Sequence, residues 1–92
     1  METLENYRKE IDAIDTELVR LFEKRMNVVL KVAEFKKANQ VQVLHHDREQ
    51  EVLGRAQKML QNKAYAESLT EFLNATMTIS KNLQKALMGD EK

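Results

Sequence analysis

The chain has 92 residues, of which 42% are hydrophobic, so it can form one domain with a modest core. Fifteen Lys and Arg balance fifteen Asp and Glu, and this zero net charge argues against nucleic acid or a membrane surface as a partner. The absence of cysteine excludes disulfides and thiolate metal sites, and no stretch approaches the roughly 18 apolar residues of a membrane span. We therefore expect a single cytoplasmic domain over residues 1–92.

The first predicted helix is long and carries a continuous apolar stripe. Proline is absent, only two glycines occur and no alternating strand pattern is present, so we expect an all-α fold. Thr3 can cap the start of this helix, which should end near Lys37 or Asn39, where the segment NQVQVLHH breaks the period. Spacings of three and four residues place the stripe on one face. Its members are Leu4, Tyr7, Ile11, Ile14, Leu18, Leu21, Val28, Val32 and Phe35.

Two further helices, one short and one of medium length, are predicted to follow. Acidic residues in the first turn and a helical apolar pattern favour a second helix from Asp47 to Asn62. The third helix should open on a capping box made by Ser68 and Glu71 and continue to about Leu87. Its apolar stripe comprises Leu69, Phe72, Leu73, Thr76, Ile79, Leu83 and Leu87.

The length of the first helix indicates a second chain. About 35 helical residues span about 50 Å, whereas a compact chain of this size has a radius of gyration near 12 Å. The helix therefore overhangs any globule that its own chain can form, and its stripe needs cover from elsewhere. A two-fold partner is the commonest source of such cover, so we expect an intertwined homodimer of six helices.

Arg25 interrupts the stripe of the first helix between Leu21 and Val28. A cation in such a seam loses its hydration unless an anion meets it. Lys36 follows eleven residues later, which places it within about 20° of Arg25 around the helix and about 16 Å along the axis. The two cations share a face and predict a local anion site.

Arg8 can join this site only from a second chain. It lies about 25 Å and about 100° from Arg25 in a straight helix, so it cannot reach the same small pocket. In an antiparallel pairing centred near residues 19 and 20, however, Arg8 of the partner subunit falls opposite residues 30 or 31. That position lies between Arg25 and Lys36, so two chains would together supply three cations.

Other polar side chains are candidates for the same site. Ser80 and Gln84 are one helical turn apart on the flank of the third helix, and Arg48 and Glu49 begin the second helix. Ordinary alternatives exist: taken singly, Arg8 and Lys36 are better explained as solvated charges at a helix edge, and Ser80 and Gln84 could be a common boundary Ser and Gln. Arg48 and Glu49 could equally be a capping charge and its neighbour.

His45 and His46 do not predict a metal site. Adjacent imidazoles rarely bind one metal ion, and no cysteine or further histidine completes a ligand set, so solvated loop histidines are favoured. The chain also lacks a convincing nucleophilic triad, a Gly-rich phosphate loop and the aromatic residues of a nucleic-acid platform.

Taken together, these segments resemble the chorismate mutases of the all-helical class from about Leu4 to Leu87. The resemblance is carried by YRKEIDAIDTELVRLFEKRMNVVLKVAEFKK, by VLHHDREQEVL and by MTISKNLQ. Within them R-x-x-I-D-x-I-D, R-M, the following Lys, R-E and S-x-x-x-Q occur in order at matching separations. The resemblance implies an intertwined dimer with two sites and the rearrangement of chorismate to prephenate, without a cofactor or metal.

The resemblance also implies a role for each candidate residue. Arg25 and Arg8 of the partner subunit would hold the two carboxylates of chorismate, with support from Arg48 and Ser80. Lys36 and Gln84 would face the ether oxygen, and Glu49 would accept from the ring hydroxyl. His45 departs from the family pattern, because an aspartate that helps to bind this hydroxyl is common at its position.

Two rival functions are kept open by the sequence. An isochorismate pyruvate-lyase resembles these mutases in fold and cationic site, although Glu49 after Arg48 favours the mutase. A non-catalytic helical dimerisation module would explain the apolar stripe but not its interruption by Arg25. Membership of a longer fusion, feedback regulation and association with another shikimate-pathway enzyme also stay open.

Overall fold

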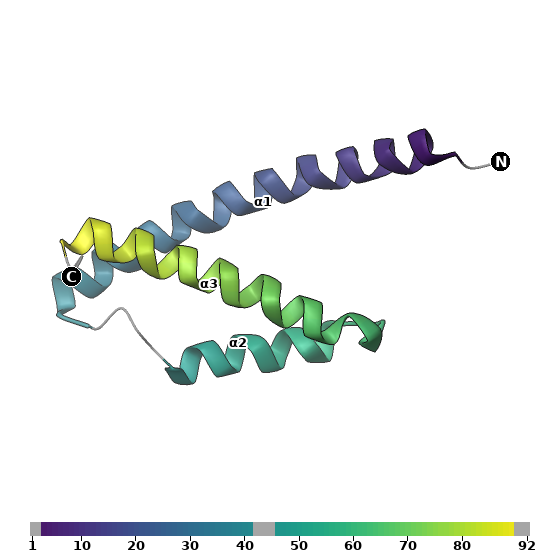
Figure 1. Ribbon diagram of the computed structural model, residues 1–92. Coiled ribbons are helices and arrows are strands. Elements are labelled where there is room, and N and C mark those ends of the chain that lie inside the picture. Colours follow the sequence, from purple (N-terminus) through teal and green to yellow (C-terminus); the bar gives the residue numbers. More distant parts are fainter. Residues whose placement is uncertain (1–2, 42–45, 90–92) are drawn as a thin grey trace.

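The computed structural model describes residues 3–41 and 46–89, and it is all helical over these ranges (Figure 1). Its elements in chain order are α1 (Leu4–Asn39), α2 (His46–Met59), the short 3-10 helix η1 (Lys63–Tyr65) and α3 (Ala66–Met88). The predicted all-α class with one long, one short and one medium helix is therefore confirmed. None of the helices in the described ranges has the length and apolarity needed to cross a membrane.

The ends of α1 agree with the sequence prediction. The side chain of Thr3 accepts a hydrogen bond from the backbone N–H of Asn6 at 3.2 Å, which caps the first turn. At the other end Gln40 adopts a left-handed conformation with φ 59°, and its backbone N–H donates to the carbonyl of Lys36. These two caps delimit one uninterrupted helix of 36 residues.

The boundary between the second and third helices differs from the prediction. α2 ends at Met59, three residues before the predicted Asn62, because the Asn62 side chain accepts from the N–H of Ala64 at 3.0 Å and starts η1 instead. The turn of η1 continues directly into α3 at Ala66, with Tyr65 as an N-cap that makes no side-chain hydrogen bond. The predicted capping box at Ser68 is wrong, because Ser68 already lies inside the helix.

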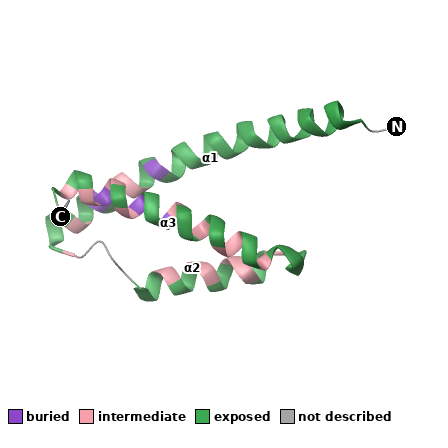
Figure 2. Cartoon of the chain, viewed as in Figure 1, coloured by how far each residue is buried: buried purple, intermediate pink, exposed green. Residues whose placement is uncertain are grey.

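The chain is elongated, as the length of α1 requires. It measures 57 × 24 × 21 Å and has a radius of gyration of 16.5 Å, against about 12 Å for a compact chain of this size. The N-terminal half of α1 projects beyond the other helices, and every residue from 3 to 25 is exposed (Figures 1 and 2). The predicted overhang is confirmed: residues of the stripe such as Ile11 and Ile14 have no cover from their own chain.

Packing within the chain is concentrated where the C-terminal half of α1 meets α3 (Figure 2). Met26 and Ala33 are buried on α1, and the complete burial of the small Ala33 side chain is consistent with close approach of the helices. On α3 the buried residues are Met77, Ser80 and Gln84. The face of α3 that packs inside the chain is therefore partly polar.

The apolar stripe predicted for α3 differs from the face that is buried inside the chain. Phe72, Ile79 and Leu87 are exposed, and Leu69, Leu73, Thr76 and Leu83 are not fully buried. The difference arises because α1 covers only one side of α3, while the apolar stripe lies mainly to another side. The fold thus leaves apolar surface on both long helices.

Alanine substitutions at the two glycines are predicted to change stability in opposite directions. Gly54 lies inside α2, and a methyl group added at its Cα would have no atom within 4 Å, so Gly54→Ala should stabilise the protein by about 0.5–1 kcal/mol through lower backbone entropy in the unfolded chain. Gly89 ends α3 with φ +74°, a conformation that alanine adopts only with strain, so Gly89→Ala should destabilise it. Urea denaturation at one protein concentration measures both; an unstabilised Gly54→Ala variant would contradict the helix assignment at this position.

Candidate active site

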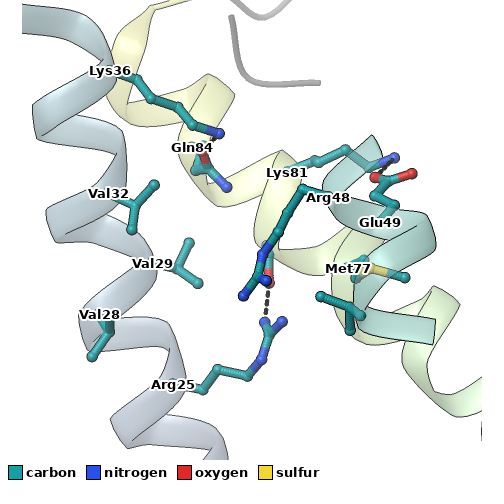
Figure 3. A pocket seen from close by; sticks show the side chains of 12 residues that line it. Arg25, Val28, Val29, Val32, Lys36, Arg48, Glu49, Met77, Lys81 and Gln84 are labelled. Carbon is teal, nitrogen blue, oxygen red and sulfur yellow. Dashed lines mark hydrogen bonds and ion pairs between the residues drawn. The ribbon is translucent and has the colours of Figure 1, made fainter. Parts of the chain in front are cut away.

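A pocket of about 300 Å³ lies where the C-terminal half of α1 meets the start of α2 and the second half of α3 (Figure 3). Aliphatic side chains form much of its wall, and charged and amide groups project into it. The lining residues are Arg25, Val28, Val29, Val32 and Lys36 from α1, Arg48, Glu49 and Val52 from α2, and Met77, Ser80, Lys81 and Gln84 from α3. Six of the residues predicted from the sequence are thus brought together: Arg25, Lys36, Arg48, Glu49, Ser80 and Gln84.

Arg25 is held in the pocket by a neutral group. Its Nη1 donates to the Oγ of Ser80 at 2.6 Å, and that hydroxyl in turn donates to the carbonyl of Thr76 at 2.9 Å. No ion pair among the described residues includes Arg25. Ser80 therefore orients the guanidinium without neutralising its charge, and an incoming anion would meet a cation already in place.

Lys36 and Gln84 form the second polar pair of the pocket. The Nζ of Lys36 donates to the Oε1 of Gln84 at 3.1 Å, and the Gln84 side chain is buried. Partial burial lowers the pKa of Lys36 below the ordinary lysine value, because desolvation disfavours the charged amine. The bond to Oε1 leaves the amide N–H groups of Gln84 as donors, so an ammonium and an amide lie side by side.

The first turn of α2 contributes Arg48, whose guanidinium points into the pocket (Figure 3). Its Nη1 also contacts the Oε1 of Glu51 at 2.6 Å on the exposed side of the helix. The hydrogen bond from Arg48, together with the charges of Arg48 and Arg55, lowers the pKa of the Glu51 carboxyl. Glu51 thereby anchors Arg48 from outside the pocket.

Glu49 is paired with a lysine that the sequence analysis did not select. Its Oε2 lies 2.9 Å from the Nζ of Lys81, and both side chains are about three-quarters buried. Lys81 follows Met77 by four residues and precedes Gln84 by three, a spacing that places it on the same side of α3. This spacing is the signal that could have identified it.

One predicted residue, Arg8, is not part of the pocket of its own chain. Arg8 lies on the projecting half of α1 and is not among the lining residues. His45 lies outside the described residues, and His46 is exposed at the start of α2. Among the described residues, no group of three or more His, Cys, Asp and Glu side chains is arranged to hold a metal ion.

The charge of the pocket is strongly unbalanced. Among the described residues that line it, there are four cationic side chains, Arg25, Lys36, Arg48 and Lys81, and a single carboxylate, that of Glu49. Glu49 is already paired with Lys81, and Arg48 contacts Glu51 outside the pocket, so positive charge is in excess among these lining residues and favours a ligand that carries more than one negative charge. A small dicarboxylate has the size and the charge that this arrangement favours.

Comparison with known proteins identifies the family. A family model described as chorismate mutase type II matches residues 7–85, a range that spans every pocket residue and Arg8. No curated protein and no solved structure matches the chain. The match covers most of the chain and agrees with the all-helical fold and the cationic pocket. The chain therefore belongs to the chorismate mutase type II family and is an isomerase that converts chorismate to prephenate.

Proposed function

We propose that the pocket between the three helices is the active site, that its cations bind the two carboxylates of chorismate, and that Arg8 of the partner subunit completes it. The observation that carries the proposal is the convergence of Arg25, Lys36 and Arg48 on one small cavity with an adjacent buried amide. The prephenate formed would supply phenylalanine and tyrosine biosynthesis in the cytoplasm.

The reaction requires that the substrate be held in the reactive conformation and that developing charge be stabilised; it does not require a nucleophile. In this Claisen rearrangement the bond between the ring and the ether oxygen breaks while the enolpyruvyl methylene bonds to the ring carbon that bears the carboxylate. Both ends belong to one molecule, so the enzyme must hold the compact diaxial conformer and stabilise negative charge on the ether oxygen. Fixed cations and amide donors are sufficient for both tasks.

Lys36 and Gln84 are suited to the ether oxygen. The ammonium and the amide are held together by the 3.1 Å hydrogen bond, so a ligand atom beside them would meet the positive charge of Lys36 and the amide N–H groups of Gln84. Charge that develops on the oxygen would meet these donors in a partly desolvated pocket, where the attraction is stronger than in water. We assign to this pair the largest share of barrier lowering.

Arg25 and Arg48 are suited to the carboxylates. Arg25 is oriented by Ser80 and has no carboxylate partner among the described residues, while Arg48 enters the pocket from the opposite helix. Ser80 would thus support carboxylate binding chiefly through Arg25. Glu49, at the start of α2, is placed to accept from the ring hydroxyl.

Surface area supports a homodimer. The single chain exposes 7643 Å², whereas a compact monomer of 10.8 kDa should expose about 5,500 Å². The excess of roughly 2,000 Å² per chain falls in the range buried by obligate partners. It includes the stripe of α1, and an antiparallel pairing of two α1 helices would place Arg8 of the partner subunit beside the pocket between Arg25 and Lys36.

The family assignment favours the mutase over the two rival functions. Glu49, which by the resemblance drawn from the sequence favours a mutase over an isochorismate pyruvate-lyase, lines the pocket. A purely structural module would not account for three cations and a buried glutamine around one cavity. No observation on this chain favours either alternative.

Arg25→Ala tests the site assignment directly. Loss of a cation that positions a substrate carboxylate should lower kcat/KM by at least about two orders of magnitude. Lys37→Ala is the control, because Lys37 lies on the same helix, is exposed, does not line the pocket and is far from the centre of the proposed pairing. The ultraviolet absorbance of chorismate follows the reaction. Equal activity of the two variants would place the active site elsewhere.

Lys36 should impose an alkaline limit on activity. Because burial lowers the pKa of Lys36, kcat/KM should fall with rising pH earlier than an ordinary lysine would allow, as the free enzyme loses the ammonium. Bound carboxylates favour the charged amine, so kcat should fall only at higher pH. Lys36→Arg keeps its charge and should lack the alkaline fall, even at a reduced rate. Identical pH profiles for both proteins would remove Lys36 from the mechanism.

Mixed dimers test whether Arg8 acts across the interface. Arg8→Ala and Arg25→Ala homodimers should both be nearly inactive, because each has two damaged sites. After refolding from an equal mixture, about half of the dimers should be mixed, and one site of each should be intact, giving about a quarter of wild-type activity. Sedimentation serves as the control for dimer formation. If Arg8 served its own chain, no activity would return.

A further inference from the structure

The helices α2 and α3 form a hairpin that is closed at one end and open at the other. Figure 1 shows the two helices meeting at η1 and diverging toward the start of α2. At the closed end the Nε2 of Gln57 donates to the carbonyl of Ala66 at 3.0 Å and to the Oγ1 of Thr70 at 2.8 Å. The pocket lies at the open end, where the first turn of α2 needs some other support.

The ion pair of Lys81 with Glu49 supplies this support. Over the described residues it is the one hydrogen bond or ion pair that joins α2 to α3 at the open end. None of the α2 residues is buried, so packing alone holds the first turn weakly. The long side chain of Lys81 spans the gap between the helices (Figure 3).

The pair is also better shielded than the other ion pairs of the described chain. Its side chains are 27% and 22% exposed, whereas those of Arg20–Glu17, Arg48–Glu51 and Arg55–Glu51 are 56–61% exposed. A shielded pair is screened less by salt and contributes more to structure than a surface pair. Lys81 in addition balances the negative charge of Glu49, which is the one carboxylate among the described lining residues and would repel an anionic substrate.

We propose that Lys81 is a positioning residue of the active site. Its ammonium holds the Glu49 carboxylate in the orientation that receives the substrate hydroxyl, and it fixes the first turn of α2, from which Arg48 reaches the pocket. The inference rests on the roles proposed above for Glu49 and Arg48. Lys81 acts through Glu49 and not by direct contact with a substrate carboxylate, because its ammonium is already engaged at 2.9 Å.

A double-mutant cycle on the full chain tests the proposal. Lys81→Met should lower kcat/KM by about tenfold, mostly through a higher KM, because both groups that it positions bind substrate. Lys81→Arg preserves the pair and should stay within about threefold of wild type. The Lys81→Met/Glu49→Gln double variant should resemble Glu49→Gln alone, since the pair is already lost in the single variant. Lys85→Met, with the same charge change on the same helix outside the pocket lining, is the control.

The outcomes separate this inference from the assignment on which it rests. Losses that multiply in the double variant would mean that Lys81 contacts substrate directly, and an unaffected Lys81→Met variant would make the pair a bystander; either result overturns the inference alone. A fully active Glu49→Gln variant would overturn the role of Glu49 and the inference with it. Circular dichroism and thermal unfolding of each variant show whether a loss of activity reflects a loss of fold. If Lys81→Met does not fold, the activity of Lys81→Arg tests the inference instead, because this variant keeps the ion pair; a loss well beyond threefold in a folded Lys81→Arg variant would overturn the inference.

Discussion

The length of α1 is the constraint on which the rest of the structure depends. A helix of 36 residues is longer than the diameter of any compact globule that 92 residues can form, so half of its apolar face has no cover from its own chain. The C-terminal half of α1 packs on α3, and the pocket forms beside this contact. The same geometry separates Arg8 from Arg25, so a site that uses both must draw on two chains.

Two cations of the pocket, Arg25 and Lys36, are oriented by hydrogen bonds to neutral groups. Several cations must stay close together without substrate, yet carboxylates placed beside them would compete with the ligand. Arg25 is oriented by a hydroxyl and Lys36 by an amide oxygen, and neither partner removes charge from the site. Among the described residues, two carboxylates contact cationic groups of the pocket: Glu51 from outside it, and Glu49, which lines it and is paired with Lys81. The positive potential is thus preserved for a dicarboxylate.

Much of this arrangement is predictable from sequence because it depends on local rules. The cap at Thr3, the length of α1 and the shared face of Arg25 and Lys36 follow from helix geometry, and the structure has all three. The start of α3 was not predictable in this way, because Asn62 starts a 3-10 turn before the capping box at Ser68 can act. Lys81 was missed because its importance comes from a contact with another helix rather than from its own pattern.

The bare stripe of α1 also bears on how the protein reaches its folded state. Because α1 precedes the other helices in the chain, its apolar face is synthesised first and stays uncovered while α2 and α3 are still being made. In the proposed homodimer the last step of folding is then an encounter between two chains, so refolding follows second-order kinetics and slows in proportion to dilution. Until that encounter the exposed face is open to mispairing with other nascent helices. For such a protein, the rate of gene expression would influence not only how much enzyme is made but also what fraction of it assembles correctly.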